Sequence, residues 1–190
     1  MKIPVIETEN LIIRPFTEDD LEPIHAVMND GFGEGNMRLR QDCLQWTMLG
    51  YKVQAQLMQP PYGERAVILK SSDTLIGAIG LVQSYAPFET LPYFQARLKG
   101  DASTLSTPEM GLFWVIDSQY RSHHYASEST QGLIDVVFNQ LGLKRIVATT
   151  DYDNLASIAV MKRLGMHIEH NPNPSPEWFQ ITGILANTHT

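Results

Sequence analysis

The sequence predicts a mixed α/β fold, and three observations support this prediction. Apolar runs of strand length, such as "RAVILK" and "EMGLFWVI", alternate with segments of helical period. The segment 126–141 repeats apolar residues every three or four positions, and the Gly142 that follows it is a typical helix-ending residue. Neither internal repeats nor low-complexity tracts interrupt the 190 residues. We therefore expect a single domain over 1–190, with a mixed sheet flanked by helices.

The first third is expected to hold one strand and two helices. "NLIIRPF" places Leu11 and Ile13 on one face of a strand, which Pro15 ends. "TEDDLEPIHAVMND" predicts a helix with Thr17 as N-cap, because acidic residues fill its first turn. A second helix within 41–58 is predicted from one apolar stripe at helical spacing. That stripe contains Leu44, Met48, Tyr51, Ala55 and Met58.

The middle of the chain predicts a hairpin, a long connection and a buried strand. "RAVILK" and "TLIGAIGLVQ" flank the polar turn "SSD", which is typical of two paired strands. The segment 84–108 has three prolines, four aromatic residues and no clear period. A connection of this length is usually functional, mobile or wrongly interpreted. "EMGLFWVI" is nearly continuous in apolar character, which predicts a central strand buried on both faces.

The last third predicts two helices and three strands. The first helix has an apolar stripe that ends just before Gly142. The strand "KRIVATT" precedes a second helix, "DYDNLASIAVMKRLG", with Asp153 or Asn154 as cap and Gly165 at its end. "MHIEHN" and "WFQITGIL" predict the final strands. The expected order is β-α-α-β-β-β-α-β-α-β-β. The stripe of the first helix contains Ala126, Thr130, Leu133, Ile134, Val137, Phe138 and Leu141.

Composition argues against several classes of partner. The net charge is 14 − 21 = −7 with neutral histidines, and no block of Lys and Arg is present, so direct nucleic-acid binding is not expected. Cys43 is the only cysteine, which excludes an intramolecular disulfide. The N-terminus lacks the apolar region of a signal peptide, and no apolar run approaches the ~20 residues needed to span a bilayer. We expect a cytoplasmic protein that does not bind membranes.

Two segments carry polar residues in patterns typical of a ligand-binding or catalytic site. "DSQYRSHHYASEST" joins a strand to a helix, where free N–H groups bind phosphate, and Arg121 adds a bidentate cation. The loop has no glycine, so a phosphate cradle, a metal site and a plain connection all stay open from these residues alone. Adjacent histidines tend to point apart, and no cysteine or cluster of acids completes a ligand set, so no metal is expected. Asn154 and Ser157 share one helix face near its N-terminus, where Asn154 also suits a simple cap.

Several motifs, taken in order, resemble the GNAT superfamily of N-acetyltransferases. The closer resemblance is to its Rim-type branch, which acetylates the N-termini of ribosomal proteins. "ETENLIIRPFTEDDLE" matches the branch's opening "ETERLxLRPFTEDDxE". Three further motifs follow in the order found in the branch: Ile76-Gly77, the strand "EMGLFWVI", and "YRSHHYASES". Relatives have "YRGKGYATEA" in place of the third. "LGLKRIVATTDYDNLASIAVMKRLGM" completes the series. The match covers roughly 7–30 and 74–170; such families build the acceptor site from regions like 31–73 and 84–108.

The resemblance implies a splayed, mixed GNAT-type sheet that binds acetyl-CoA, with no metal. The acceptor amine attacks the thioester directly, and Glu109 serves as general base, alone or through a water. Many relatives use a tyrosine as acid; Met161 stands at that position here, so Ser157 is the expected substitute. His124 stands where relatives have glycine, which puts affinity for the cofactor in question. The implied cofactor-binding residues are Phe113, Trp114, Val115, Ile116, Arg121, Ser122, His123, His124, Tyr125, Ala126 and Asn154.

The sequence leaves more than one acceptor and more than one function open. A protein N-terminal α-amine and a small amine are both compatible with the sequence, as are a monomer and a homodimer. A catalytically silent module that binds acyl-CoA, as a sensor or scaffold, is the main rival, because the loop glycine and the tyrosine acid are both replaced. A pure protein-interaction domain that binds no CoA is a third option.

Overall fold

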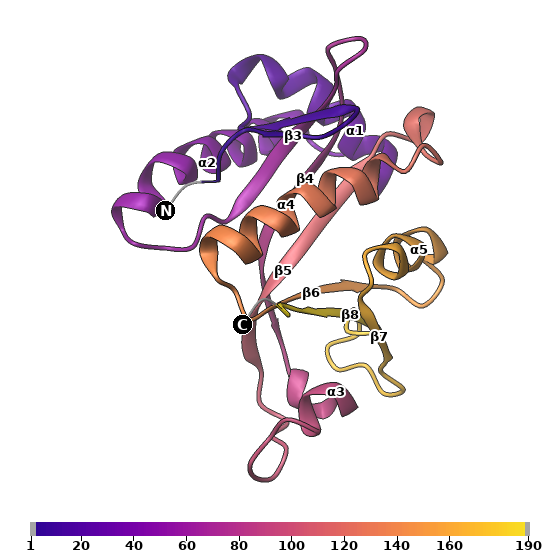
Figure 1. The fold of residues 1–190 in the computed structure, drawn as a ribbon. Coiled ribbons are helices and arrows are strands. Elements are labelled where there is room, and N and C mark those ends of the chain that lie inside the picture. The colour runs from indigo at the N-terminus through magenta and orange to yellow at the C-terminus, as the bar shows by residue number, and fades with distance from the viewer. Residues whose placement is uncertain (1–2, 189–190) are drawn as a thin grey trace. The chain divides into compact units, whose positions relative to one another are not determined.

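The computed structural model describes residues 3–188. The eight strands of these residues form one mixed sheet in the order β1-β2-β3-β4-β5-β6-β8-β7. Figure 1 labels strands β3 to β8 of this sheet. Contacts divide the chain into two compact units. The first unit contains the chain up to Val82 and Phe113–Gly142; the second contains Gln83–Leu112 and the chain from Leu143 onward. The predicted mixed α/β class is confirmed, and the predicted element order gains only short elements. The single-domain boundary over 1–190 stays a prediction.

The first unit is an antiparallel sheet region with three helices. Strand β2 pairs with β1 and β3, and β3 pairs with β4, all antiparallel. A register shift lies between Val67 and Ile68 of β3. The elements are β1 Ile6–Glu7, β2 Leu11–Arg14, α1 Leu21–Phe32, α2 Met37–Gln56, β3 Gly63–Leu69, most of β4 Thr74–Ala86, the end of β5 Thr107–Ile116, and α4 Tyr125–Leu141.

The chain turns into α1 through a short 3₁₀ segment, Glu18–Asp20, rather than directly at Thr17. Asp20 is buried, and its carboxylate accepts hydrogen bonds at 2.7 and 2.8 Å from the guanidinium of Arg14. The same carboxylate accepts the backbone N–H of Thr17 at 2.7 Å. The predicted N-cap at Thr17 is therefore correct, and Asp20 completes a capping box by accepting the Thr17 N–H.

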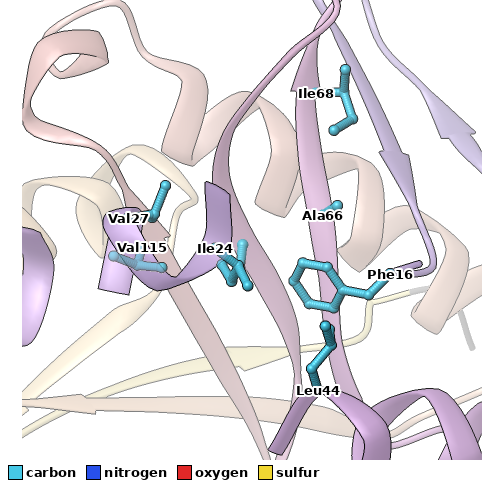
Figure 2. Close-up of a cluster of buried hydrophobic side chains, with 8 residues drawn as sticks. Phe16, Ile24, Val27, Leu44, Ala66, Ile68 and Val115 are labelled. Carbon is cyan, nitrogen blue, oxygen red and sulfur yellow. The ribbon is translucent and has the colours of Figure 1, made fainter. Parts of the chain in front are cut away.

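The core of the first unit lies between α1, α2 and the sheet. Figure 2 shows Leu44 of α2 pointing toward Phe16 and Ala66, with Ile24 of α1 close by. Of the predicted apolar stripe of α2, Leu44 is buried, and Met48, Tyr51 and Ala55 are partly buried. The prediction that Met58 belongs to this stripe is wrong. Met58 is 91% exposed, because the helix ends at Gln56 and Met58 has a left-handed φ of 55°.

Strands β4 and β5 approach so closely at Gly77 that only glycine fits. A Cβ at this position would lie 2.3 Å from the carbonyl oxygen of Val115, a backbone atom that has no alternative rotamer. Just beyond, the N–H of Asp117 donates to the carbonyl of Ile76 at 2.9 Å. These contacts fix the last residues of β5 and the point where the following loop begins.

The second unit contains the remaining strands and two helices. Strand β5 runs parallel to β6, paired at Gly111 and Val147, and β8 is antiparallel to both β6 and β7. Gly165 follows the end of α5, as predicted, and has a left-handed φ of 73°. The elements are the end of β4, a 3₁₀ turn Phe88–Thr90, α3 Pro92–Gln95, the first part of β5, β6 Arg145–Thr150, α5 Leu155–Arg163, β7 His167–His170 and β8 Ile181–Ala186.

The segment 84–108 is more ordered than the sequence indicates. Its first residues extend β4 to Ala86, and its last two begin β5 at Thr107. Between them, the aromatic residues that showed no period are core residues. Phe88 and Phe94 are buried with their ring centroids 5.3 Å apart, and Phe88 meets Phe179 edge-on. The segment is thus anchored in the second unit by irregularly spaced aromatic side chains.

Candidate functional site

The loop before α4 adopts the conformation that glycine usually supplies, although it contains none. His124 has φ 67° and ψ 7°, and Ser122 has φ 65°, both in the left-handed region. The N–H of Glu128 donates to the carbonyl of His124 at 2.9 Å and so begins the hydrogen-bond ladder of α4. The amides of Tyr125, Ala126 and Ser127 precede that ladder and have no partner within it. His124 therefore does not close the helix terminus.

The side chains of His123 and Tyr125 pack together on this loop, and His123 also contacts the loop backbone. The Nδ1 atom of His123 lies 2.8 Å from the carbonyl oxygen of Arg121. Its ring stacks on Tyr125, with centroids 5.4 Å apart and 13° between the planes. His123 and His124 are both exposed. The arrangement of free amides beside an arginine and two histidines suits an anion with several oxygens, such as a diphosphate.

Asp30, at the end of α1, anchors the start of the loop. Its carboxylate accepts the N–H of Ser118 at 2.8 Å and the hydroxyl of Ser118 at 2.7 Å. It also accepts from the guanidinium of Arg121 at 3.1 Å. The hydrogen bonds from Ser118, followed by the charge of Arg121, lower the pKa of Asp30. Asp30 was missed in the sequence because it lies 88 residues from Ser118, and no motif marks it.

The end of β5 presents two different faces. The ring of Phe113 stacks on that of Phe32 of α1, with their centroids 6.0 Å apart. Val115 is buried in the core cluster of the first unit, and Phe113 packs against that cluster. By strand alternation, Trp114 and Ile116 point to the opposite face. Arg121 reaches back to this strand, and its Nε donates to the carbonyl of Ile116 at 3.3 Å. The residues Phe113–Ile116 and the loop Arg121–Ala126 are thus joined within the first unit.

In the second unit, Glu109 forms an ion pair that the sequence did not reveal. Both carboxylate oxygens accept from the guanidinium of Arg145, Oε2 from Nε at 2.9 Å and Oε1 from a terminal nitrogen. The side chain of Glu109 is 10% exposed and that of Arg145 is 25% exposed. The guanidinium also lies over the ring of Phe94, 4.8 Å from its centroid. In the sequence, Arg145 was visible only as a residue of the predicted strand "KRIVATT", with nothing to link it to Glu109.

Asn154 and Ser157 lie at the N-terminus of α5, as predicted. The side-chain oxygen of Asn154 accepts the N–H of Ser157 at 3.0 Å, which confirms the cap. Ser157 is partly exposed, and within its own unit its hydroxyl makes no hydrogen bond among the described residues. Met161 is fully buried, and its sulfur occupies the space that a Cβ at Gly183 would need. The hydroxyl of Ser157 is therefore available to a ligand, whereas Met161 serves packing.

Comparison with known proteins decides the family. Residues 10–167 match the family described as Acetyltransferase (GNAT) domain, which is most of the chain. The chain belongs to this GNAT family. It is 34% identical over 103 residues to the uncharacterized N-acetyltransferase YnaD of Bacillus subtilis, an alignment that covers 54% of this chain and 49% of YnaD, so it spans about half of that relative.

Solved GNAT structures share the fold. An acetyltransferase from Agrobacterium tumefaciens superposes with a TM-score of 0.69 at 19% identity, covering 97% of this chain and 95% of that one. RimL, an alpha-N-protein acetyltransferase of a ribosomal protein, solved in complex with coenzyme A, gives a TM-score of 0.65 at 13% identity, covering 96% and 98%. The use of acetyl-CoA is general for GNAT proteins. No helix within residues 3–188 is long and apolar enough to cross a membrane.

Replacing His124 tests whether the left-handed turn matters for an anion. We expect His124→Gly to retain affinity for acetyl-CoA within about threefold, since glycine adopts this conformation freely. We expect His124→Val to weaken binding about tenfold, because a β-branched residue disfavours positive φ by roughly 1–2 kcal/mol and the amides then turn away. Isothermal titration calorimetry measures both affinities.

The matched control is His170→Val, which makes the same change at an exposed strand position of β7. It should leave the affinity unchanged. Wild-type affinity in His124→Val would show that the conformation at this residue does not control the binding loop.

Proposed function

We propose that this protein transfers the acetyl group of acetyl-CoA to a primary amine, which attacks the thioester directly. The observation that carries this proposal is the loop Arg121–Ala126, whose left-handed residues leave the first amides of α4 open beside a cationic side chain. Membership of the GNAT family supplies the acetyl donor that suits this loop.

The residues present fit the parts of the cofactor. The amides of the loop and the guanidinium of Arg121 would hold the diphosphate, with Ser122, His123, His124, Tyr125 and Ala126 shaping the loop. The backbone of Phe113–Ile116 would pair with the pantetheine arm, because extended backbone offers amide groups at regular spacing. For Asn154, a role in binding the cofactor rests on the GNAT resemblance alone, and its side chain caps α5. Asp30 would keep Arg121 in place through its hydrogen bond.

Two side chains are proposed to move protons. The bound thioester supplies an activated acetyl group and a thiolate as leaving group. Glu109 would accept the proton of the attacking amine, alone or through a water, which requires at least one oxygen to be shared with or released from Arg145. Ser157 would donate a proton at its Oγ to the departing sulfur, consistent with a hydroxyl that has no partner in its own unit among the described residues.

The acceptor is proposed to be a protein N-terminus, with a small amine as the alternative. An α-amine has a pKa of about 7.7–8.0, against about 10.4 for lysine, so it is partly neutral near pH 7. It therefore needs only a modest base, such as a carboxylate. RimL, which shares the fold, is an alpha-N-protein acetyltransferase, and its acceptor agrees in kind with the one proposed.

Thermal unfolding with acetyl-CoA tests the proposal at its first step. At 100 times the dissociation constant, a ligand that binds only the folded state adds about 2.7 kcal/mol, which for a chain of this size raises Tm by about 5–10 °C. Coenzyme A should act similarly, and pantetheine, which lacks the diphosphate, should act much less. If acetyl-CoA in large excess leaves Tm unchanged, neither an acetyltransferase nor an acyl-CoA sensor is tenable.

A catalytically silent acyl-CoA-binding module remains a second candidate because of one observation. The carboxylate proposed as base is held on both oxygens by Arg145. A continuous assay of thiol release, against a panel of N-terminal peptides and small amines, separates the two candidates. Binding without amine-dependent thiol release across this panel would favour the sensor.

A further inference from the structure

The outer face of α2 carries an apolar stripe that nothing in the first unit covers. Leu39 is 62% exposed, Trp46 is 76% exposed and Leu57 is 61% exposed. Cys43 is exposed as well, and Gly50 and Val53 are partly exposed. We call these six residues the outer seam: Leu39, Cys43, Trp46, Gly50, Val53 and Leu57. Leu57 keeps the helical register, because its N–H donates to the carbonyl of Val53 at 3.0 Å.

The outer seam follows a heptad pattern. Its members alternate in steps of four and three residues, which is the spacing of positions a and d in a coiled coil. The side chains that α2 contributes to its own core lie on a different face: Figure 2 shows Leu44 directed toward Phe16 and Ala66. Helix α2 therefore has two apolar faces, and one is used within the chain.

Gly50 lies in the middle of α2 without an evident reason inside the chain. A Cβ at this position would find, as its three nearest atoms, only the end of the flexible Gln54 side chain, at 3.1 to 4.0 Å. Gly50 has no left-handed φ. Glycine is among the poorest residues for a helix interior. A glycine at this position would allow a large side chain from a second molecule to approach the helix backbone closely.

We propose that the outer seam pairs two copies of this chain through antiparallel α2 helices. With a two-fold axis beside residue 48, each seam residue of one copy faces a seam residue of the second copy. Trp46 lies across from Gly50 of the second copy, Cys43 across from Val53, and Leu39 across from Leu57. Trp46, the largest side chain of the seam, thus packs against Gly50, which has no side chain. The two-fold axis repeats this contact on its other side.

The flanking residues agree with this pairing. Leu49, which is 51% exposed, meets its own copy beside the axis and adds apolar area. Asp42 lies beside Gln56 of the second copy and Arg40 beside Gln54, so no like charges face each other. Covering the exposed leucines and Trp46 in both copies removes on the order of 1,000 Å² from water, near the lower bound for a specific interface.

Sedimentation equilibrium measures the association directly. We expect the full chain to form a dimer at micromolar concentration, and Trp46→Glu and Gly50→Leu to shift the dissociation constant by at least 100-fold. Gly50→Leu should remain at least as helical as the wild type, because leucine favours helix more than glycine does. Leu105→Glu, at a 75% exposed leucine of the second unit, is the matched control and should stay dimeric.

Crosslinking defines the direction of the pair. In the antiparallel pair, the two Cys43 residues lie ten positions apart along the axis, about 15 Å, so a short bis-maleimide should not join wild-type chains. Val53→Cys should crosslink efficiently, because residue 53 faces Cys43 of the second copy. Val53→Cys combined with Cys43→Ser should not crosslink.

Three results would overturn the proposal. These are a wild-type chain that is monomeric at every concentration up to the millimolar range, a dimer that survives both seam substitutions, and efficient crosslinking of the wild type through Cys43. The last would indicate parallel helices or a different surface. Binding of acetyl-CoA by the monomeric variants would show that the seam is separate from the proposed activity.

Discussion

Replacing Ser157 with alanine is expected to lower kcat about 100-fold or more, the usual contribution of a proton donor in the transition state. Its hydroxyl has no partner in its own unit among the described residues, and the Asn154 cap uses only its backbone N–H. The fold and the affinity for acetyl-CoA should therefore stay unchanged. Steady-state thiol release gives kcat, and calorimetry gives the dissociation constant.

Two substitutions sharpen this test. Ser157→Thr retains a hydroxyl and should recover a substantial part of kcat. Ser72→Ala removes an exposed serine from the turn between β3 and β4, and should change neither quantity. If Ser157→Ala keeps full kcat with a peptide acceptor, the proton reaches the sulfur from another group or from water, and the role assigned to Ser157 is wrong.

Removing Arg145 is expected to lower the free energy of unfolding by about 3 kcal/mol, because it leaves a buried carboxylate without its partner. The side chain of Glu109 is only 10% exposed and gives both oxygens to this guanidinium. Urea denaturation of Arg145→Met measures the change. The stacking of the guanidinium on Phe94 is lost at the same time, which adds to the effect.

Glu109 supplies the matched comparison. The double variant Glu109→Gln with Arg145→Met should be more stable than Arg145→Met alone, since the uncompensated charge is gone. Arg163→Met, at an exposed position of α5, should stay within about 0.5 kcal/mol of the wild type. A loss below about 1 kcal/mol for Arg145→Met would mean that water reaches Glu109, which would favour its role as a base.

Most of the fold could be predicted from the sequence because its elements carry strong local signals. The helix that ends at Gly142 has a regular apolar stripe, and Gly142 adopts the expected left-handed conformation. The cap at Asn154 and the break at Gly165 were likewise correct. Segment 84–108 was described less well, because Phe88 and Phe94 are buried at spacings that match neither a helix nor a strand.

The candidate site was predicted in its parts but not in its contacts. Strand, loop and helix around 109–130 could be placed from motif order, since each is contiguous in the chain. Asp30 and Arg145 could not, because the first is 91 residues from Arg121 and the second 36 residues from Glu109. Pairing over such separations depends on how strands and helices stack, and no local pattern encodes it.

By itself, the sequence determined the class of fold, the order of its main elements and the resemblance to GNAT acetyltransferases, because periodicity, caps and contiguous motifs are local properties. The tertiary structure alone decided that His124 takes the backbone conformation of a glycine, that Glu109 is engaged by Arg145, and that one apolar face of α2 lies exposed. These three features depend on backbone conformation, partners and solvent exposure, which arise only when distant segments pack together.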